Sequence, residues 1–251
     1  MVGAQDSPGP LTLCGVGCTR AKSRAVSAVH VRNPVPLRPY TCRLRPMADM
    51  RAFRDAVAGW ATGGPDGPAR ELATSLGART AVLLEGLSDL AAVEALAARR
   101  GRDLAAEGVC VVPMGGAMSV GRYATLLGPP GLGLRLTGLC DENEQGFYES
   151  GLTRAGAPSQ DIHVCVADLE DELIRALGTA GVEEILGAEG DLRAWQTFQR
   201  QPAQHGRPRD QQLRRFLGTK KGRKIRYGRL LVEALTPGRT PPPLDGLLAG
   251  V

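Results

Sequence analysis

The sequence predicts an α/β fold with a parallel sheet, flanked by helices and followed by a helical, basic C-terminal extension. From residue 80 to about residue 178, short apolar runs alternate with helical patterns of about 10–14 residues, which is typical of βαβ units. After residue 180 only helical patterns occur. The composition, 43% hydrophobic and 23% charged residues, is that of an ordinary globular protein.

The chain before residue 80 divides into two expected parts. Residues 1–46 are rich in Pro, Gly, Ser and Arg without sustained periodicity, so we expect an N-terminal disordered segment. Residues 47–79 form an expected helical lead, because apolar residues recur at spacings of three and four in "MADMRAFRDAVAGWATGG". Met1, Met47 and Met50 are alternative translation starts.

Residues 80–180 form the expected α/β domain. Its strands are predicted in "TAVLLEG", "GVCVVPMGG", "GLRLTGLCDENE" and "DIHVCVA", where continuous apolar runs are typical of buried parallel strands. The helix "SDLAAVEALAARRG" follows the first strand, with Ser88 as a candidate N-cap. Two further helices are predicted in "AMSVGRYATLLG" and "FYESGLTRAG". A fourth follows the last strand, where Asp168 and Asp171 fit a capping-box-like start.

Residues 181–251 form the expected helical basic extension. Helices are predicted in "GVEEILGAEG", "DLRAWQTFQRQ", "RDQQLRRFLG" and "RKIRYGRLLVEAL", and "TPPPLDGLLAGV" closes the region. Between residues 141 and 191 there are 13 Asp/Glu and 2 Arg, whereas residues 193–229 contain 12 Lys/Arg and one acid. This distribution indicates a metal-holding centre beside a phosphate-attracting surface, or else two solvated faces that pair with each other.

Acidic residues follow three of the four predicted strands. The carboxyl ends of parallel strands share one edge of the sheet, where ligands gather. Oxygen ligands that converge from several strand ends are what Mg²⁺ or Mn²⁺ requires. The residues concerned are Glu85 and Asp89 after the first strand, Asp141, Glu142, Asn143 and Glu144 after the third, and Asp168 and Glu170 after the fourth.

Each of these acids also has a structural alternative. Asp89 suits the dipole of the helix that it begins, and Asp168 suits a helix cap. Glu142 and Glu144 suit a solvated turn. The convergence of the three strand ends favours the metal site.

The segments "VLLEGLSDLAAVEAL", "VVPMGGA" and "LTGLCDENE" resemble the Toprim domain of topoisomerases, primases and overcoming-lysogenization-defect (OLD) family nucleases. That family has a Glu-Gly after its first strand and an Asp-x-Asp after a later one. "EGLSD" and the later "DLED" are more similar to the OLD branch. The resemblance covers residues 80–180, and the layout of the whole chain resembles stand-alone Toprim proteins of that branch.

The resemblance implies roles for several of the acids. Glu85 would be the general acid/base or a metal ligand, Asp89 and Asp141 would be metal ligands, and Glu170 would match an additional acid of the OLD branch. Asn143 replaces the second Asp of the Asp-x-Asp pattern, and its amide oxygen can bind Mg²⁺ without contributing charge. Glu142 or Glu144 is the alternative ligand at this position.

A later lysine steadies the charged transition state in the family that the chain resembles. The candidates are Lys220, Lys221 and Lys224 in "GTKKGRKIRYGR". Of these, we take Lys221 and Lys224 as candidate catalytic residues. Basic residues on helical surfaces also suit phosphate contacts. The predicted nucleic-acid-binding residues are Arg214, Arg215, Lys220, Lys221, Arg223, Lys224 and Arg226.

These inferences predict a Mg²⁺- or Mn²⁺-dependent nuclease or phosphodiester-transfer protein that acts on nucleic acid, with DNA as the expected partner. The alternative is a non-catalytic Toprim module that binds nucleic acid or a partner protein. We expect no nucleotide cofactor, because no G-x-x-x-x-G-K-[ST] motif occurs, and a separate ATPase is a possible partner. We expect a cytoplasmic protein without a membrane contact, because no apolar run reaches about 18 residues.

The six cysteines favour neither a disulfide framework nor a zinc site. Cys14, Cys18 and Cys42 lack a fourth ligand at a suitable spacing, with His30 as the only nearby candidate. The other three lie in apolar runs and are expected to be buried, namely Cys110, Cys140 and Cys165.

Overall fold

The computed structural model describes residues 46–158 and 161–251. The predicted disorder of residues 1–46 and the weighed zinc ligands Cys14, Cys18, Cys42 and His30 lie, apart from Pro46, outside the described residues. In the described part, no helix is long and apolar enough to cross a membrane.

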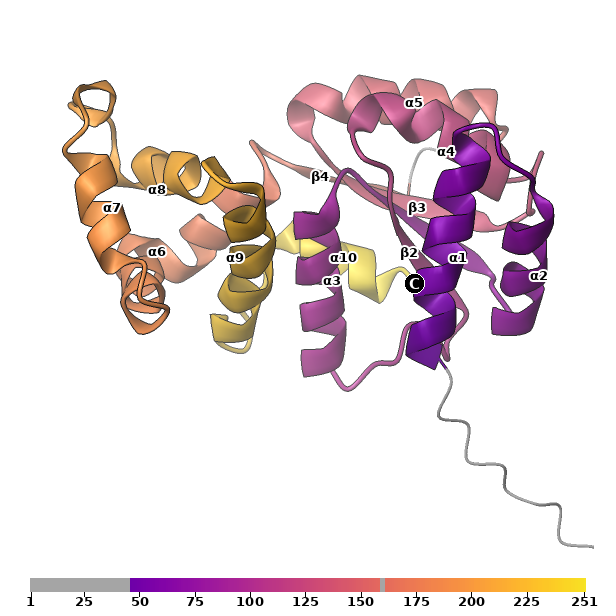
Figure 1. Ribbon diagram of the computed structural model, residues 1–251, viewed down its shortest axis with the longest axis horizontal. Coiled ribbons are helices and arrows are strands. Elements are labelled where there is room, and N and C mark those ends of the chain that lie inside the picture. The colour runs from indigo at the N-terminus through magenta and orange to yellow at the C-terminus, as the bar shows by residue number, and fades with distance from the viewer. Residues whose placement is uncertain (1–45, 159–160) are drawn as a thin grey trace, which may run out of the picture. The chain divides into compact units, whose positions relative to one another are not determined.

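Four parallel strands form the sheet, in the order β2-β1-β3-β4 (Figure 1). They are β1 (Thr80–Leu84), β2 (Val109–Pro113), β3 (Arg135–Asp141) and β4 (Ile162–Cys165). In register, Leu84 lies beside Pro113 and Leu139, and Asp141 lies beside Cys165, so all four strands end at one edge. The predicted α/β class with a parallel sheet is confirmed.

Helices cover both faces of this sheet. Alternate strand residues serve the two cores: Ala81 and Leu83 pack on one face, and Val82 and Leu84 on the other. This alternation follows from the period of two in a strand. The first face is covered by α1 (Pro46–Ala61), α2 (Gly67–Leu76), α4 (Val120–Leu127) and α5 (Gln145–Arg154).

The core on the second face is formed by helices that come mostly from the C-terminal region and that pack on the strands or on one another. They are α3 (Leu87–Arg99), α6 (Leu169–Ala188), α7 (Leu192–Gln199), α8 (Arg209–Gly218), α9 (Lys221–Ala234) and α10 (Pro242–Ala249). Helix α9 lies against α3, and a Cβ added at Gly228 would meet the Ser88 carbonyl oxygen at 2.6 Å. The close approach of the two helices therefore requires glycine at this position. The domain boundaries given above stay predictions.

Three short 3₁₀ helices complete the described elements: η1 (Ala117–Ser119), η2 (Glu142–Glu144) and η3 (Pro202–Gln204). η1 follows β2, and η2 follows β3 directly, ahead of α5. The two predicted helices on either side of Gly178 form the single element α6, in which that glycine interrupts the helical backbone with φ 76°. Cys110, Cys140 and Cys165 are buried free cysteines, as predicted.

One sequence-based expectation is wrong, and residues 242–249 form a helix that was not predicted. Ser88 is not the N-cap of α3, because the cap is Gly86 and Ser88 is buried in the first turn. The Asp89 carboxylate caps instead, accepting a hydrogen bond from the Gly86 N–H at 3.0 Å. "TPPPLDGLLAGV" does more than close the chain, since it contains α10, with Pro in its first turn, where the missing N–H costs nothing.

Candidate metal centre

Three carboxylates converge where β1 and β3 end. One oxygen from each of Glu85, Asp141 and Glu144 lies within 4.8 Å of the others. Glu85 directly follows β1, Asp141 is the last residue of β3, and η2 folds Glu144 back toward both. Within the described ranges, none of these three carboxylates has a Lys, Arg or His nitrogen within 4.0 Å.

Burial and then the neighbouring negative charges raise the pKa of two of these acids. Burial, followed by the Asp168 and Glu85 carboxylates, raises the pKa of Asp141 to about 8. Burial and the neighbouring Glu85 raise the pKa of Glu144 to about 6. Like charges in a partly buried site disfavour ionisation unless a cation joins them. This site therefore stabilises either protons or a positive ion.

The donor set fits a divalent cation. One Glu144 oxygen, Oε2, is buried and has no hydrogen-bond partner among the described residues. A buried carboxylate oxygen without a donor is costly, and a cation would satisfy it. Three hard oxygen donors, two at strand ends and one on η2, suit Mg²⁺ or Mn²⁺ better than zinc, which prefers nitrogen and sulfur.

The residues between Asp141 and Glu144 differ in position. Glu142 and Asn143 are both exposed, whereas Glu144 is half-buried. Among the two glutamates, η2 brings Glu144 and not Glu142 into the cluster. Glu144 is thus the acid that accompanies Asp141 where the family pattern has its second Asp, and the predicted ligand role of Asn143 stays a prediction.

Asp89 lies beside the cluster but its oxygens already have partners. Its carboxylate accepts hydrogen bonds from the Gly86 N–H at 3.0 Å and the Ser88 hydroxyl at 3.3 Å. Burial raises its pKa, and the Glu85 carboxylate adds to that effect. Asp89 therefore orders the first turn of α3 behind Glu85, and its predicted role as a metal ligand stays a prediction.

The acids after β4 are neutralised by the chain's own cations. Asp168 caps α6 by accepting from the Asp171 N–H at 2.8 Å, as predicted, and accepts from Arg214 Nε at 2.6 Å. Glu170 is buried, and Lys224 Nζ lies 3.3 Å from its Oε2. Burial raises the pKa of Glu170 to about 7, although the lysine opposes this shift.

Of the three candidate lysines, Lys224 lies deepest. Burial lowers its pKa, but the Glu170 and Asp89 carboxylates raise it more, so its pKa is above the ordinary value. Lys224 and the exposed Lys221 line a pocket of about 170 Å³ together with Glu85 and Asp89. Lys220 is exposed and is not among the residues that line this pocket.

The predicted nucleic-acid-binding residues divide into two groups. Four of them form ion pairs with acids of this chain: Arg214 with Asp168, Arg223 and Arg226 with Asp191, and Lys224 with Glu170. The other three, Arg215, Lys220 and Lys221, are exposed and form no ion pair with a described residue. The interpretation that the acidic and basic blocks pair with each other therefore holds for the first group only.

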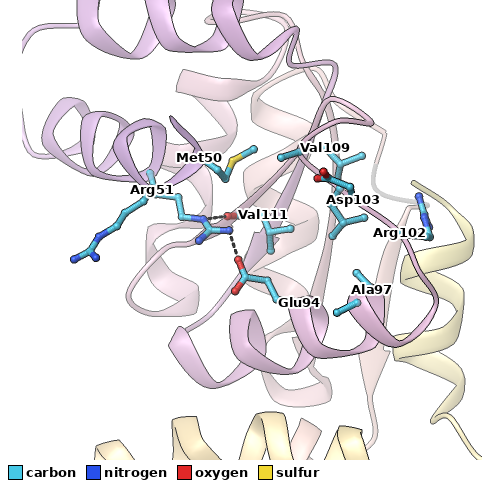
Figure 2. Close-up of a pocket in the computed structure, with 12 residues that line it drawn as sticks. Met50, Arg51, Glu94, Ala97, Arg102, Asp103, Val109 and Val111 are labelled. Carbon is cyan, nitrogen blue, oxygen red and sulfur yellow. Dashed lines mark hydrogen bonds and ion pairs between the residues drawn. The ribbon is translucent and has the colours of Figure 1, made fainter. Parts of the chain in front are cut away.

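A larger pocket, of about 420 Å³, lies between α1, α3 and β2 (Figure 2). Its floor includes the buried side chains of Val109, Val111 and Ala97. Arg54 crosses it, donating to the Val111 carbonyl at 2.7 Å and pairing with Glu94. Its two lining acids do not converge as the strand-end acids do, because Glu94 is paired with Arg54 and Asp103 is not part of an acidic cluster in the described structure, so the strand-end acids form the better chemical site.

Comparisons with known proteins agree with this geometry. Residues 76–142 match the family of overcoming lysogenization defect protein-like TOPRIM domains. The match contains β1, α3, β2 and β3, and includes Glu85, Asp89 and Asp141. The resemblance inferred from the sequence is confirmed for this segment, which matches the model of OLD-like TOPRIM domains.

Solved structures extend the likeness beyond that segment. The C-terminal region of the Burkholderia pseudomallei OLD protein is 19% identical, with a TM-score of 0.50 over 69% of this chain and 96% of that one. The C-terminal region of the Xanthomonas campestris pv. campestris OLD protein is 23% identical, with a TM-score of 0.51 over 69% and 91%. At these identities the likeness establishes the fold. No curated protein matches the sequence.

Proposed function

We propose that this protein is a divalent-metal-dependent enzyme that hydrolyses or transfers phosphodiester bonds in nucleic acid. The observation that carries the proposal is the cluster of Glu85, Asp141 and Glu144, which has no cation partner in the described structure although its acids crowd together. The OLD-like TOPRIM match supports it, because Glu85 and Asp141 lie within the matched residues 76–142, and Glu144 follows two residues later.

In this proposal the three carboxylates hold the ion, Mg²⁺ or Mn²⁺. A bound divalent ion polarises a phosphoryl oxygen and makes water a stronger nucleophile near neutral pH. Glu85, at the mouth of the pocket that it shares with the lysines, accepts the proton of the attacking hydroxyl or water. Asp141 and Glu144, raised in pKa when no ion is bound, lose their protons as the cation binds.

Two lysines at this site have separate functions in the proposal. Lys224 is held by Glu170 at 3.3 Å, and the same pocket contains Glu85. A phosphate at the metal would lie within the field of this ammonium, which stabilises negative charge that develops on the phosphoryl oxygens. Lys221, which is exposed at the edge of the pocket, contacts the adjoining phosphate backbone in this proposal.

A cleavage assay on supercoiled and linear DNA, with Mg²⁺, Mn²⁺ or EDTA, tests the proposal. We expect metal-dependent cleavage that EDTA abolishes and that is lost in Glu85→Gln. Glu142→Gln is the matched control, because Glu142 is exposed and lies outside the cluster, and it should cleave like the wild type. Cleavage that persists in EDTA or in Glu85→Gln contradicts the proposal.

The second candidate is a non-catalytic TOPRIM module that binds nucleic acid or a partner protein. The amide at Asn143, where the family pattern has an acid, favours it, because one ligand charge is missing there. DNA binding without any cleavage, unchanged in Asp141→Asn, would select this alternative. A separate ATPase partner and a cytoplasmic location are further proposals, which co-purification and localisation would test.

A further inference from the structure

Large apolar side chains are exposed at the carboxyl ends of the strands. In the part of the chain that the structure describes, five such side chains are exposed. Four of them follow the four strands, one after each: Leu87 (43% exposed), Met118 (85%), Phe147 (49%) and Val166 (61%). The fifth, Leu192 (39%), begins α7, which packs on α6 and α8 and not on the sheet.

These four side chains, which we call the apolar rim, occupy the same edge as the acidic cluster because all four strands are parallel. Leu87 lines the pocket that contains Glu85 and Lys221. Phe147 lies on α5 and Met118 on η1, and these two elements contact each other. The apolar rim therefore follows the strands at the edge where the carboxylates lie, and Leu87 shares a pocket with one of them, Glu85.

Exposed apolar side chains scattered singly need no explanation, but their concentration around one site does. A protein partner would favour a continuous apolar patch with few charges at its centre. Here the same edge carries charges: the three carboxylates follow β1 and β3, and Lys221 and Glu85 line one pocket with Leu87. A nucleotide chain has the complementary chemistry, with phosphates for the cation and lysine and with flat apolar faces on its bases.

We propose that the apolar rim contacts unpaired bases of a nucleic acid whose phosphate lies at the acidic cluster, so that the substrate is single-stranded or locally unpaired. Phe and Met are side chains that stack on bases or insert between them. In an intact duplex the base faces are covered by their neighbours, so the rim would find no partner. The inference depends on the proposed function only for the position of the phosphate.

Binding experiments without turnover test this inference. Fluorescence anisotropy compares a labelled single strand with the duplex of the same sequence, in Ca²⁺ and separately in EDTA. We expect the wild type to prefer the single strand. Phe147→Ala and Met118→Ala should each weaken single-strand binding roughly tenfold, the scale of one lost base contact, and change duplex binding by less than about twofold.

Two variants serve as controls. Leu192→Ala removes an exposed apolar side chain on α7, away from the sheet edge, and should leave both affinities unchanged. Phe147→Trp keeps a stacking surface and should retain single-strand binding. Circular dichroism melting curves verify that each variant is folded.

Several outcomes would overturn the inference: a wild type that prefers the duplex or binds neither form, Phe147→Ala and Met118→Ala variants that bind like the wild type, or equal losses on both forms. A preference for the single strand that depends on Phe147, in a protein that never cleaves, would support the rim and refute the proposed function. Cleavage without any strand preference would refute the rim alone.

Discussion

Two groups of acids at the same sheet edge differ in how the fold treats their charge. At the ends of β1 and β3, Glu85, Asp141 and Glu144 face one another without a described cation in ion-pair range. After β4, Asp168 and Glu170 are paired with Arg214 and Lys224. The difference shows that an acidic block is not itself a metal site: the fold neutralises one group and leaves the other without an ion-pair partner among the described residues.

The same distinction applies to the cations. Arg226 and Arg229 on α9 pair with acids of the chain, whereas Lys220 and Lys221 at the start of the same helix do not pair with described residues. Paired cations stabilise the fold, and unpaired cations are free to attract phosphate. Each of the following predictions separates a paired from an unpaired charge.

The largest expected effect concerns the two aspartates at the sheet edge. Asp141→Asn removes a proposed ligand charge and should lower metal-dependent cleavage by roughly 10²–10⁴-fold. Asp168→Asn keeps a capping side chain and loses the pair with Arg214, which is half-exposed, so cleavage should fall only a few-fold. Rates under matched metal concentrations measure both. Equal losses of cleavage in the two variants would contradict the distinction between the unpaired Asp141 and the paired Asp168.

Next in size is the effect of Lys224→Gln on stability. The change leaves Glu170 buried without its partner, which should cost about 1–2 kcal/mol of the free energy of unfolding in urea. The cost stays below that of a fully buried pair because Lys224 is partly exposed, and because Glu170, with a pKa of about 7, can take up a proton. Lys221→Gln is the control and should leave stability unchanged.

The double variant Lys224→Gln/Glu170→Gln tests whether the ion pair is responsible. It removes both charges, so it should recover most of the lost stability. A double variant as unstable as Lys224→Gln alone would show that the packing of the lysine stem, and not its charge, stabilises α9 against α6.

The third prediction concerns pH and the metal-free protein. Asp141 has a folded-state pKa of about 8 and a reference value of 3.8, so between these values the folded state holds a proton that the unfolded state has lost. The free energy of unfolding should therefore fall as pH rises from about 4 to 8. Asp141→Asn removes this pH-dependent fall in the free energy of unfolding, so it should raise Tm at pH 8 by about 2–4 °C.

A bound metal should reverse the order of the two melting temperatures, those of the wild type and of Asp141→Asn. Mn²⁺ binds the ionised carboxylates, so it should raise Tm of the wild type more than that of Asp141→Asn, and more strongly at pH 8 than at pH 6. Differential scanning calorimetry with and without Mn²⁺ measures both effects. A melting temperature of the wild type that does not change when Mn²⁺ is added at pH 8 would contradict the metal centre.

The sequence was sufficient for the sheet and for the strand ends, because continuous apolar runs and the acids behind them are local signals. The sequence was insufficient to predict which side chains pair with those acids. Arg214 is 46 residues from Asp168 in the chain and meets it only because α6 and α8 pack together. The choice of Glu144 over Glu142 depends on the 3₁₀ geometry of η2, which no periodicity reveals.

The remaining misses have local causes. Ser88 looked like a cap because serine commonly is one, but packing of α9 against α3 buries it. The prolines of α10 resembled a chain end, although Leu244, Leu247 and Leu248 complete the core beneath β3 and β4. The signal for α10 was present in the spacing of those leucines, behind prolines that a helix tolerates in its first turn.

The smallest expected effect is on the salt dependence of nucleic-acid binding, and it contrasts two pairs of cations on and beside one helix. Removing Lys220 and Lys221 together, as Lys220→Gln/Lys221→Gln, should reduce the slope of log Kobs against log salt by about 0.7 for each lost phosphate contact on a single strand. Arg226→Gln/Arg229→Gln removes the same formal charge, but from side chains already paired with Asp191 and Glu233. That double variant should leave the slope almost unchanged, since few counterions are released when a neutralised cation meets phosphate. Equal slopes in the two variants would mean that net charge alone, and not the pairing of individual side chains, governs how this surface attracts nucleic acid.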